Sequence, residues 1–135
     1  MLQTNFEREC DRLSAAVDQV QFERMRWARE EGPMLARLAE LTQAAVAERE
    51  DYELTEEGSA GNIRRYVLKV HGTRVCAVAV GLVRGQAVMD AEAIERSRFR
   101  LAPGDASAIS YGDVDEDWIA GALQRVFGRI AAEAA

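Results

Sequence analysis

The stretch Ile63–Val83, IRRYVLKVHGTRVCAVAVGLV, decides the fold of this chain. Apolar and polar residues alternate over 63–70, which is typical of a strand with one buried face. His71-Gly72 predicts a tight turn, and 73–83 is almost continuously apolar, as in a central strand covered on both faces. The sequence therefore predicts a central antiparallel hairpin, in which Gly81 marks a bulge or a close approach of two backbones.

Shorter segments on both sides of this hairpin predict further strands. Tyr52 and Leu54 alternate with acids ahead of a polar loop at 56–62, which is the one plausible hinge. Turn signals after the hairpin separate three more strand segments, at 86–90, 96–101 and 106–111. The segment 91–95 fits a single helical turn, and 102–105 predicts a type II turn. We expect a meander of about five antiparallel strands.

The N-terminal region predicts helices. Thr4 and Glu7 form a capping box, so a helix should begin near Asn5. Gly32-Pro33 interrupts the pattern, and a second helix is expected over 33–49. The interruption is compatible with a kink or with a helical hairpin, and the short break favours the kink.

The C-terminal region predicts one amphipathic helix. Asp115 is a good N-cap, and acids follow it in the first turn, where the helix dipole favours them. Four apolar residues form its expected buried stripe: Ile119, Leu123, Val126 and Ile130. The fold class is thus α+β in a single domain, 1–135, with a helical arm (1–50), an antiparallel sheet (51–112) and a C-terminal helix packed on the sheet (113–135). The small residues 131–135 should fray.

Composition and charge narrow the class of protein. The 135 residues are 48% hydrophobic and 30% charged, which is normal for a globular domain. The net charge of −6 is uneven, because 58–111 carry 8 basic and 4 acidic side chains whereas 1–57 carry 7 and 14. An acidic chain makes general nucleic-acid binding a poor expectation. No membrane span or signal pattern is found, so we expect a cytoplasmic protein, and its abundant arginine and alanine suggest a GC-rich bacterial genome.

The helical arm carries more apolar surface than one sheet face obviously needs. Its positions Phe6, Cys10, Leu13, Val17 and Val20 alternate steps of four and three, as in a coiled-coil seam. Coverage by the sheet and a homodimer seam both remain open. The residues expected in a dimer interface are Phe6, Leu13, Val17, Phe22, Met25 and Trp27.

Three arginines form the main candidate for a partner- or anion-binding site. Arg96, Arg98 and Arg100 would share one face of a strand over 96–101, and guanidinium groups suit carboxylates and phosphates. The alternative is a solvated edge strand that is protected from aggregation.

The remaining candidate residues give weaker indications of a functional site. The acids of 113–117 fail the calcium-loop pattern and fit helix capping, so no metal is expected. His71 is the only histidine, and its predicted turn places it away from any pocket. Cys10 and Cys76 fit no zinc or redox spacing and are expected to be buried, reduced thiols. The glycines match no nucleotide-binding motif, so we expect no cofactor and no catalytic residue.

Three functions follow from these features. We favour a non-catalytic binding or regulatory protein, a homodimer that engages a macromolecular partner as an adaptor, chaperone or inhibitor. The first alternative is a small-molecule sensor or small enzyme with a pocket between sheet and helices. Tyr66, Tyr111 and Trp118 would line it, and Asp90, Asp113 or Asp115 would supply acid–base groups. The second alternative is nucleic-acid binding through the basic sheet segment.

Overall fold

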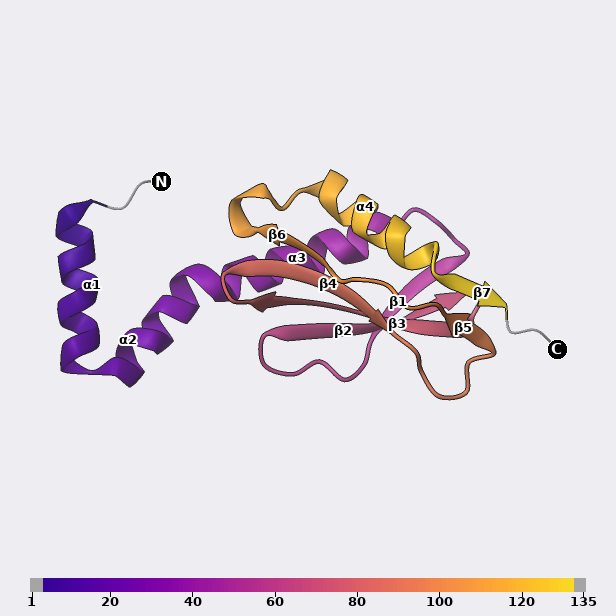
Figure 1. Cartoon of the computed structure of the whole chain (residues 1–135), viewed down its shortest axis with the longest axis horizontal. Coiled ribbons are helices and arrows are strands. Elements are labelled where there is room, and N and C mark those ends of the chain that lie inside the picture. The colour runs from indigo at the N-terminus through magenta and orange to yellow at the C-terminus, as the bar shows by residue number, and fades with distance from the viewer. Residues whose placement is uncertain (1–3, 133–135) are drawn as a thin grey trace. The chain divides into compact units, whose positions relative to one another are not determined.

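The computed structural model describes residues 4–132 of the chain. They belong to two compact units, Met1–Met34 and Leu35–Ala135, and each is described by itself. The second unit holds the sheet and the C-terminal helix (Figure 1). The predicted α+β class, with N-terminal helices, an antiparallel sheet and a C-terminal helix, is confirmed. Within residues 4–132, no helix combines the length and the apolar character that a membrane crossing requires.

The first unit contains α1 (Asn5–Val17) and α2 (Gln19–Arg26). The Thr4 hydroxyl accepts a hydrogen bond from the Glu7 backbone N–H at 3.1 Å, which confirms the predicted helix start. Asp18 is extended, with φ −153°, and its carboxylate caps α2 by accepting from Gln21 N–H at 3.1 Å. The sequence pattern missed this break, because the apolar spacing continues across Asp18 to Val20.

At the predicted interruption, Gly32-Pro33, the chain forms a π-helical turn and not a loop, so the helices do not form the hairpin that was the alternative to a kink. Trp27–Glu31 is π-helical, and the Gly32 N–H donates to the Trp27 carbonyl, five residues earlier. Because proline has no N–H, a widened turn ahead of Pro33 removes the demand for a bond that it cannot make. Helix α3 (Gly32–Val46) then follows without a loop.

The second unit is built on one five-stranded antiparallel sheet in the order β1-β2-β3-β4-β6. Its strands are β1 (Tyr52–Glu56), β2 (Ile63–Val70), β3 (Thr73–Val83), β4 (Gln86–Glu92) and β6 (Ser107–Ser110). The central hairpin, β2 and β3, has the predicted bounds. His71 and Gly72 both have positive φ, at 50° and 74°, as the two-residue turn between them requires. The ladder carries its bulge between Leu68 and Lys69.

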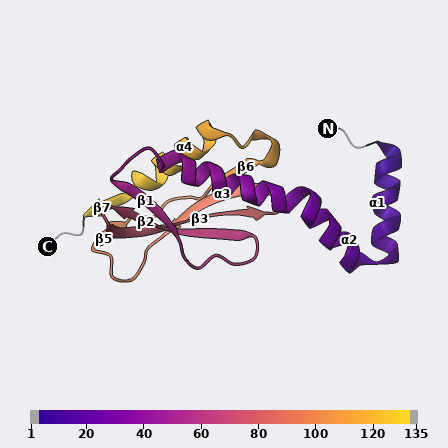
Figure 2. The same ribbon diagram turned by 180° about the vertical axis from the view of Figure 1, so that it is seen from behind.

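One face of this sheet is covered by α3, from Leu35 onward, and by α4 (Glu116–Phe127) (Figures 1 and 2). The strand residues on that face alternate along each strand and are almost fully buried; they include Tyr66, Leu68, Val78, Val80 and Met89. The helices contribute Leu35, Leu38, Ile119 and Leu123 to the same core. Asp115 caps α4, as predicted, by accepting from Trp118 N–H at 2.8 Å.

The segment after β4 departs from the prediction. The strand expected over 96–101 begins only at Phe99, because 95–96 form a turn in which Arg96 has φ 65°. Strand β5 (Phe99–Leu101) does not join the main sheet; it pairs with β7 (Ile130–Ala132). Residues 131–132 are therefore ordered in a strand and do not fray, and the rest of that predicted tail, 133–135, lies outside the described residues.

Candidate functional site

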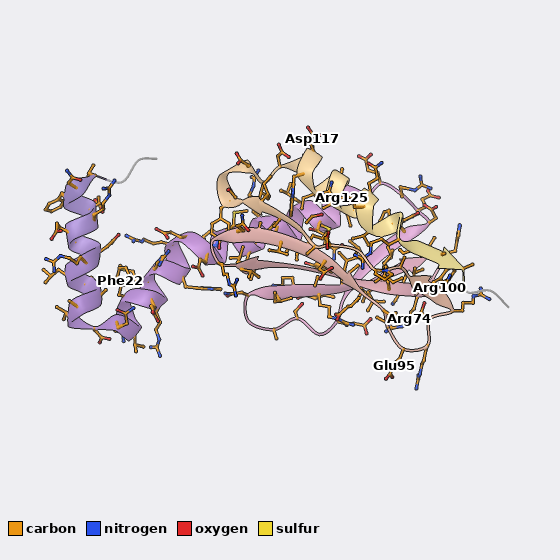
Figure 3. All side chains as sticks on the ribbon, viewed as in Figure 1. Phe22, Arg74, Glu95, Arg100, Asp117 and Arg125 are labelled. Atoms are coloured by element: carbon orange, nitrogen blue, oxygen red, sulfur yellow. The ribbon has the colours of Figure 1, made fainter. Side chains whose placement is uncertain are left out.

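The structure separates the three arginines that the sequence predicted on one strand face. Arg96 lies in the turn after β4, Arg98 precedes β5, and Arg100 is the central residue of β5. Figure 3 shows Arg100 at the end of the sheet unit where β5 and β7 lie, and Glu95 at the tip of the loop before β5. All three arginines are exposed, and within residues 4–132 none of them forms an ion pair or a side-chain hydrogen bond. All three are accessible to an external anion, but each lies at a different place in the segment from the turn after β4 to β5.

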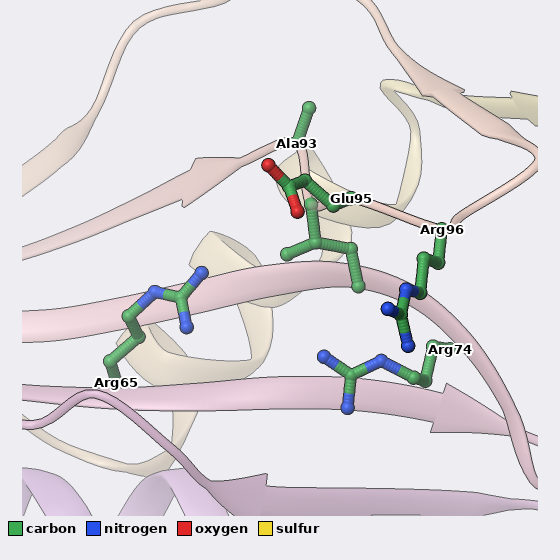
Figure 4. A pocket seen from close by; sticks show the side chains of 6 residues that line it. Arg65, Arg74, Ala93, Glu95 and Arg96 are labelled. Atoms are coloured by element: carbon green, nitrogen blue, oxygen red, sulfur yellow. The ribbon is translucent and has the colours of Figure 1, made fainter.

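Arg96 lines an arginine hollow on the sheet face opposite the helices (Figure 4). The hollow has a volume of about 580 Å³, and its lining residues are Arg65, Arg74, Ala93, Ile94, Glu95 and Arg96. Beneath it, Val67 and Ala77 are fully buried although no helix covers this face. The arginine stems and the loop after β4 therefore serve as the cover of the sheet here.

The charges of the arginine hollow are largely compensated. Arg65 pairs with Glu92, and its Nη1 donates to the Glu57 carbonyl oxygen at 3.1 Å. Arg74 Nη1 donates to both carboxylate oxygens of Glu57, at 3.1 and 3.4 Å. The contacts to Glu57 tie the loop after β1 to the sheet, whereas the Arg65–Glu92 pair joins β2 to β4. Because the ion pairs are partly exposed, they contribute only about 0–1 kcal/mol each. Arg96 is thus the one uncompensated guanidinium among the described residues lining the hollow.

A second cavity, the apolar pocket, lies between the two sheets and α4. It has a volume of about 420 Å³ and ten lining residues: Tyr52, Leu68, Val70, His71, Thr73, Val75, Arg98, Phe99, Phe127 and Ile130. The rings of Tyr52 and Phe127 stand 5.6 Å apart at 49° and form one wall. The sequence could not show this pocket, since it depends on the pairing of β5 with β7. The pocket expected around Tyr66 is wrong, because Tyr66 is 2% exposed and part of the core.

His71 and Arg98 are the basic side chains of the apolar pocket, and both are exposed. The expectation that His71 is remote from any pocket is therefore wrong, although its place in the β2–β3 turn is as predicted. Its backbone N–H donates to the Asp51 carbonyl at 2.7 Å. The Asp51 carboxylate is held by Arg49 at 2.9 and 2.7 Å, and these hydrogen bonds lower its pKa.

The helices of the first unit expose the apolar side chains that were predicted to form a dimer interface. No residue of α1 or α2 is buried. The exposed fractions are 75% for Phe6, 57% for Leu13, 78% for Val17, 58% for Val20, and 41% for both Met25 and Trp27. Phe22 is half-buried. We call this set, with Cys10, the apolar stripe.

The two cysteines differ. Cys76 is buried in β3, as predicted, and burial raises the pKa of its thiol to about 11, so it is inert at neutral pH. Cys10 is exposed, which contradicts the prediction. It lies at a seam position of α1 that nothing in the described chain covers.

The predicted acid–base groups do not converge. Asp115 caps α4, the Asp90 carboxylate accepts from Ala91 N–H at 2.8 Å, and Asp113 lies in a 3₁₀ turn. Over residues 4–132, no three His, Cys, Asp or Glu side chains gather as metal ligands would. Comparison with protein-family models, with curated proteins and with solved structures found no match for this chain. Function must therefore be argued from these surfaces.

Proposed function

We propose that this chain is a non-catalytic binding protein that pairs with a second copy of itself through the apolar stripe. The observation that carries the proposal is the exposure of the stripe: six large apolar side chains are between 41% and 78% exposed, five of them on α1 and α2 and the sixth, Trp27, in the π-helical turn. Water-exposed apolar surface of this extent is typical of an interaction surface.

The pattern of α1 favours an identical partner. Phe6, Cys10, Leu13 and Val17 follow the alternating spacing of a coiled-coil seam, which is narrow and complementary to a copy of itself. In a parallel pair, Glu9 would face Ser14 of the second copy rather than another acid. For a specific, stable dimer, the stripe and its surroundings would have to bury about 1,200 Å² or more over the two copies.

Sizing by light scattering tests the pairing. At tens of micromolar, the expected mass is twice the 14.9 kDa of a single chain. Leu13→Glu places a charge in the seam and should weaken pairing by roughly 100-fold or more. Arg8→Glu puts the same side chain on the opposite face of α1 and should leave the dimer intact. A monomeric wild type, or a Leu13→Glu variant that still pairs, would refute the proposal.

The partner surface that we propose is formed by Arg96, Arg98 and Arg100, and its target is an acidic protein segment. The support is that all three are exposed and unpaired within residues 4–132, so they need give up no internal ion pair to bind a carboxylate. Replacing the three by Glu should abolish capture of the partner from extracts of the native host. The matched control replaces Lys69, Arg84 and Arg125, which lie in the same unit and change the charge equally. Capture that survives the first triple variant would remove these arginines from the proposal.

A further inference from the structure

The apolar pocket between the two sheets has features of a small-ligand site that pairing does not require, and one of its lining residues, Arg98, also belongs to the proposed partner surface. Its lining comes from β1, β2, β3, the segment ending in β5, α4 and β7, all within the second unit. A volume of about 420 Å³ falls in the usual range for small-molecule sites.

The pocket stays open for a structural reason. Strand β2 ends and strand β3 begins at the tight His71-Gly72 turn, and β5 pairs with β7 in a separate sheet. The two sheets share no ladder, so the distance between them is not fixed by backbone hydrogen bonds. The rings of Tyr52 and Phe127 pack against each other and leave the space beside them unfilled.

The polar groups of the pocket define the charge of its ligand. Arg98 is exposed and has no ion pair within residues 4–132, and the His71 side chain lies with it in the lining. None of the ten lining residues is acidic. Asp51, next to Tyr52, is already engaged by both Nε and Nη2 of Arg49. A cation would therefore find no counter-ion here, whereas an anion would find an unpaired guanidinium.

We infer that the apolar pocket binds a small monocarboxylate with an aromatic or medium-chain apolar body. The carboxylate pairs with Arg98, and the apolar body lies against Phe99, Phe127 and Ile130. A single guanidinium matches one carboxylate in two parallel hydrogen bonds. The apolar walls favour a ligand whose remaining surface is uncharged. This inference is independent of the proposed pairing, because every lining residue belongs to the second unit.

Calorimetric titration of the full-length protein with 1-naphthylacetate tests the inference. The expected Kd is on the order of 0.1–1 mM, from about 0.3 kcal/mol for each non-hydrogen atom of the probe. Amide chemical-shift changes should centre on Val70, Phe99 and Ile130. The matched cation, 1-naphthylmethylamine, carries the same ring and should bind at least tenfold more weakly. Equal binding of the two probes would overturn the assignment of an anion, and no binding of 1-naphthylacetate at 5 mM, roughly five times the weaker expected Kd, would overturn the site.

Variants of the lining residues measure separately how the charge and the shape of the pocket contribute to binding of the probe. Arg98→Gln should weaken 1-naphthylacetate roughly tenfold, as expected for a lost hydrogen bond to a charged group, and Arg98→Lys should recover part of the affinity. Arg84→Gln removes the same charge from the β3–β4 turn, outside the lining of the pocket, and should leave the Kd unchanged. Thr73→Phe fills the pocket without changing its charge and should weaken the probe as strongly as Arg98→Gln. If Arg84→Gln weakens the probe as much as Arg98→Gln does, the effect is one of net charge and the site is refuted.

Discussion

Gly81, two residues before the end of β3, offers the sharpest test of the sheet. A β-carbon added at this position would lie 2.8 Å from the Asn62 carbonyl oxygen and closer still to Cδ1 of Ile63. That carbonyl accepts a hydrogen bond from Leu82 N–H at 3.1 Å, so it cannot retreat without losing the bond. Gly81→Ala therefore forces either the backbone or the Ile63 side chain to move.

The expected cost follows from two opposing effects. Overpacking of a well-ordered sheet costs about 1–3 kcal/mol, and alanine returns about 0.4–1 kcal/mol by restricting the unfolded chain. Gly81→Ala should therefore lower the free energy of unfolding by about 1–2 kcal/mol, which is a fall in Tm of roughly 3–8 °C for a protein of this size. Adding Ile63→Val removes Cδ1 and should recover only part of this loss, because the Asn62 carbonyl remains in place.

Urea denaturation followed by Trp118 fluorescence in a Trp27→Phe background reports on the second unit alone. Gly121→Ala is the matched control, because Gly121 lies within α4 and an added β-carbon meets nothing closer than Arg125 Nη1 at 3.9 Å. The same substitution should there stabilise the protein by about 0.5–1 kcal/mol. If Gly81→Ala is as stable as the wild type, or if Ile63→Val restores stability fully, the argument from the backbone carbonyl is wrong.

Three further predictions rest on other parts of the chain. In the folded protein diluted below the Kd of pairing, iodoacetamide at pH 8 should alkylate Cys10 and spare Cys76, because burial raises the pKa of the Cys76 thiol to about 11; equal labelling by mass spectrometry would contradict this. Asp115→Ala should cost about 1 kcal/mol in urea denaturation by removing the cap on Trp118 N–H, whereas Asp115→Asn should cost much less. The helical signal at 222 nm should fall when the protein is diluted below the Kd of pairing, and a signal that is independent of concentration would argue against coupling of helix formation to association.

The sequence predicted best those elements whose signal is local. The bounds of β2 and β3 follow from alternation and from a turn dipeptide, and the first residues of α1 and α4 follow from the N-caps Thr4 and Asp115. Those signals lie within a few residues of the structure they determine, so no tertiary information is needed.

The sequence did not predict the elements whose structure depends on contacts with distant segments of the chain. The alternation over 96–101 resembles a strand of the main sheet, but Arg96 turns with positive φ and β5 pairs with residues about thirty positions later. The sequence could not predict the apolar pocket either, because two of its lining residues, Phe99 and Ile130, come from the paired strands β5 and β7. The prediction that Cys10 is buried is wrong for a related reason: the heptad pattern predicts a seam and does not say which chain covers it.

The distribution of buried side chains along the chain bears on both proposals, which are pairing through the first unit and ligand binding in the second. Every side chain in the buried core of the described chain lies at or beyond Leu35, so the second unit has its own core. Helix α1 has 13 residues and no buried side chain, and an isolated helix of such length is marginal in water, whereas α2 continues through the π-helical turn into α3. The stabilisation of α1 must then come largely from surface that it buries elsewhere, for which the apolar stripe is the available means. Association would thus order α1, whereas the buried core of the second unit does not depend on pairing.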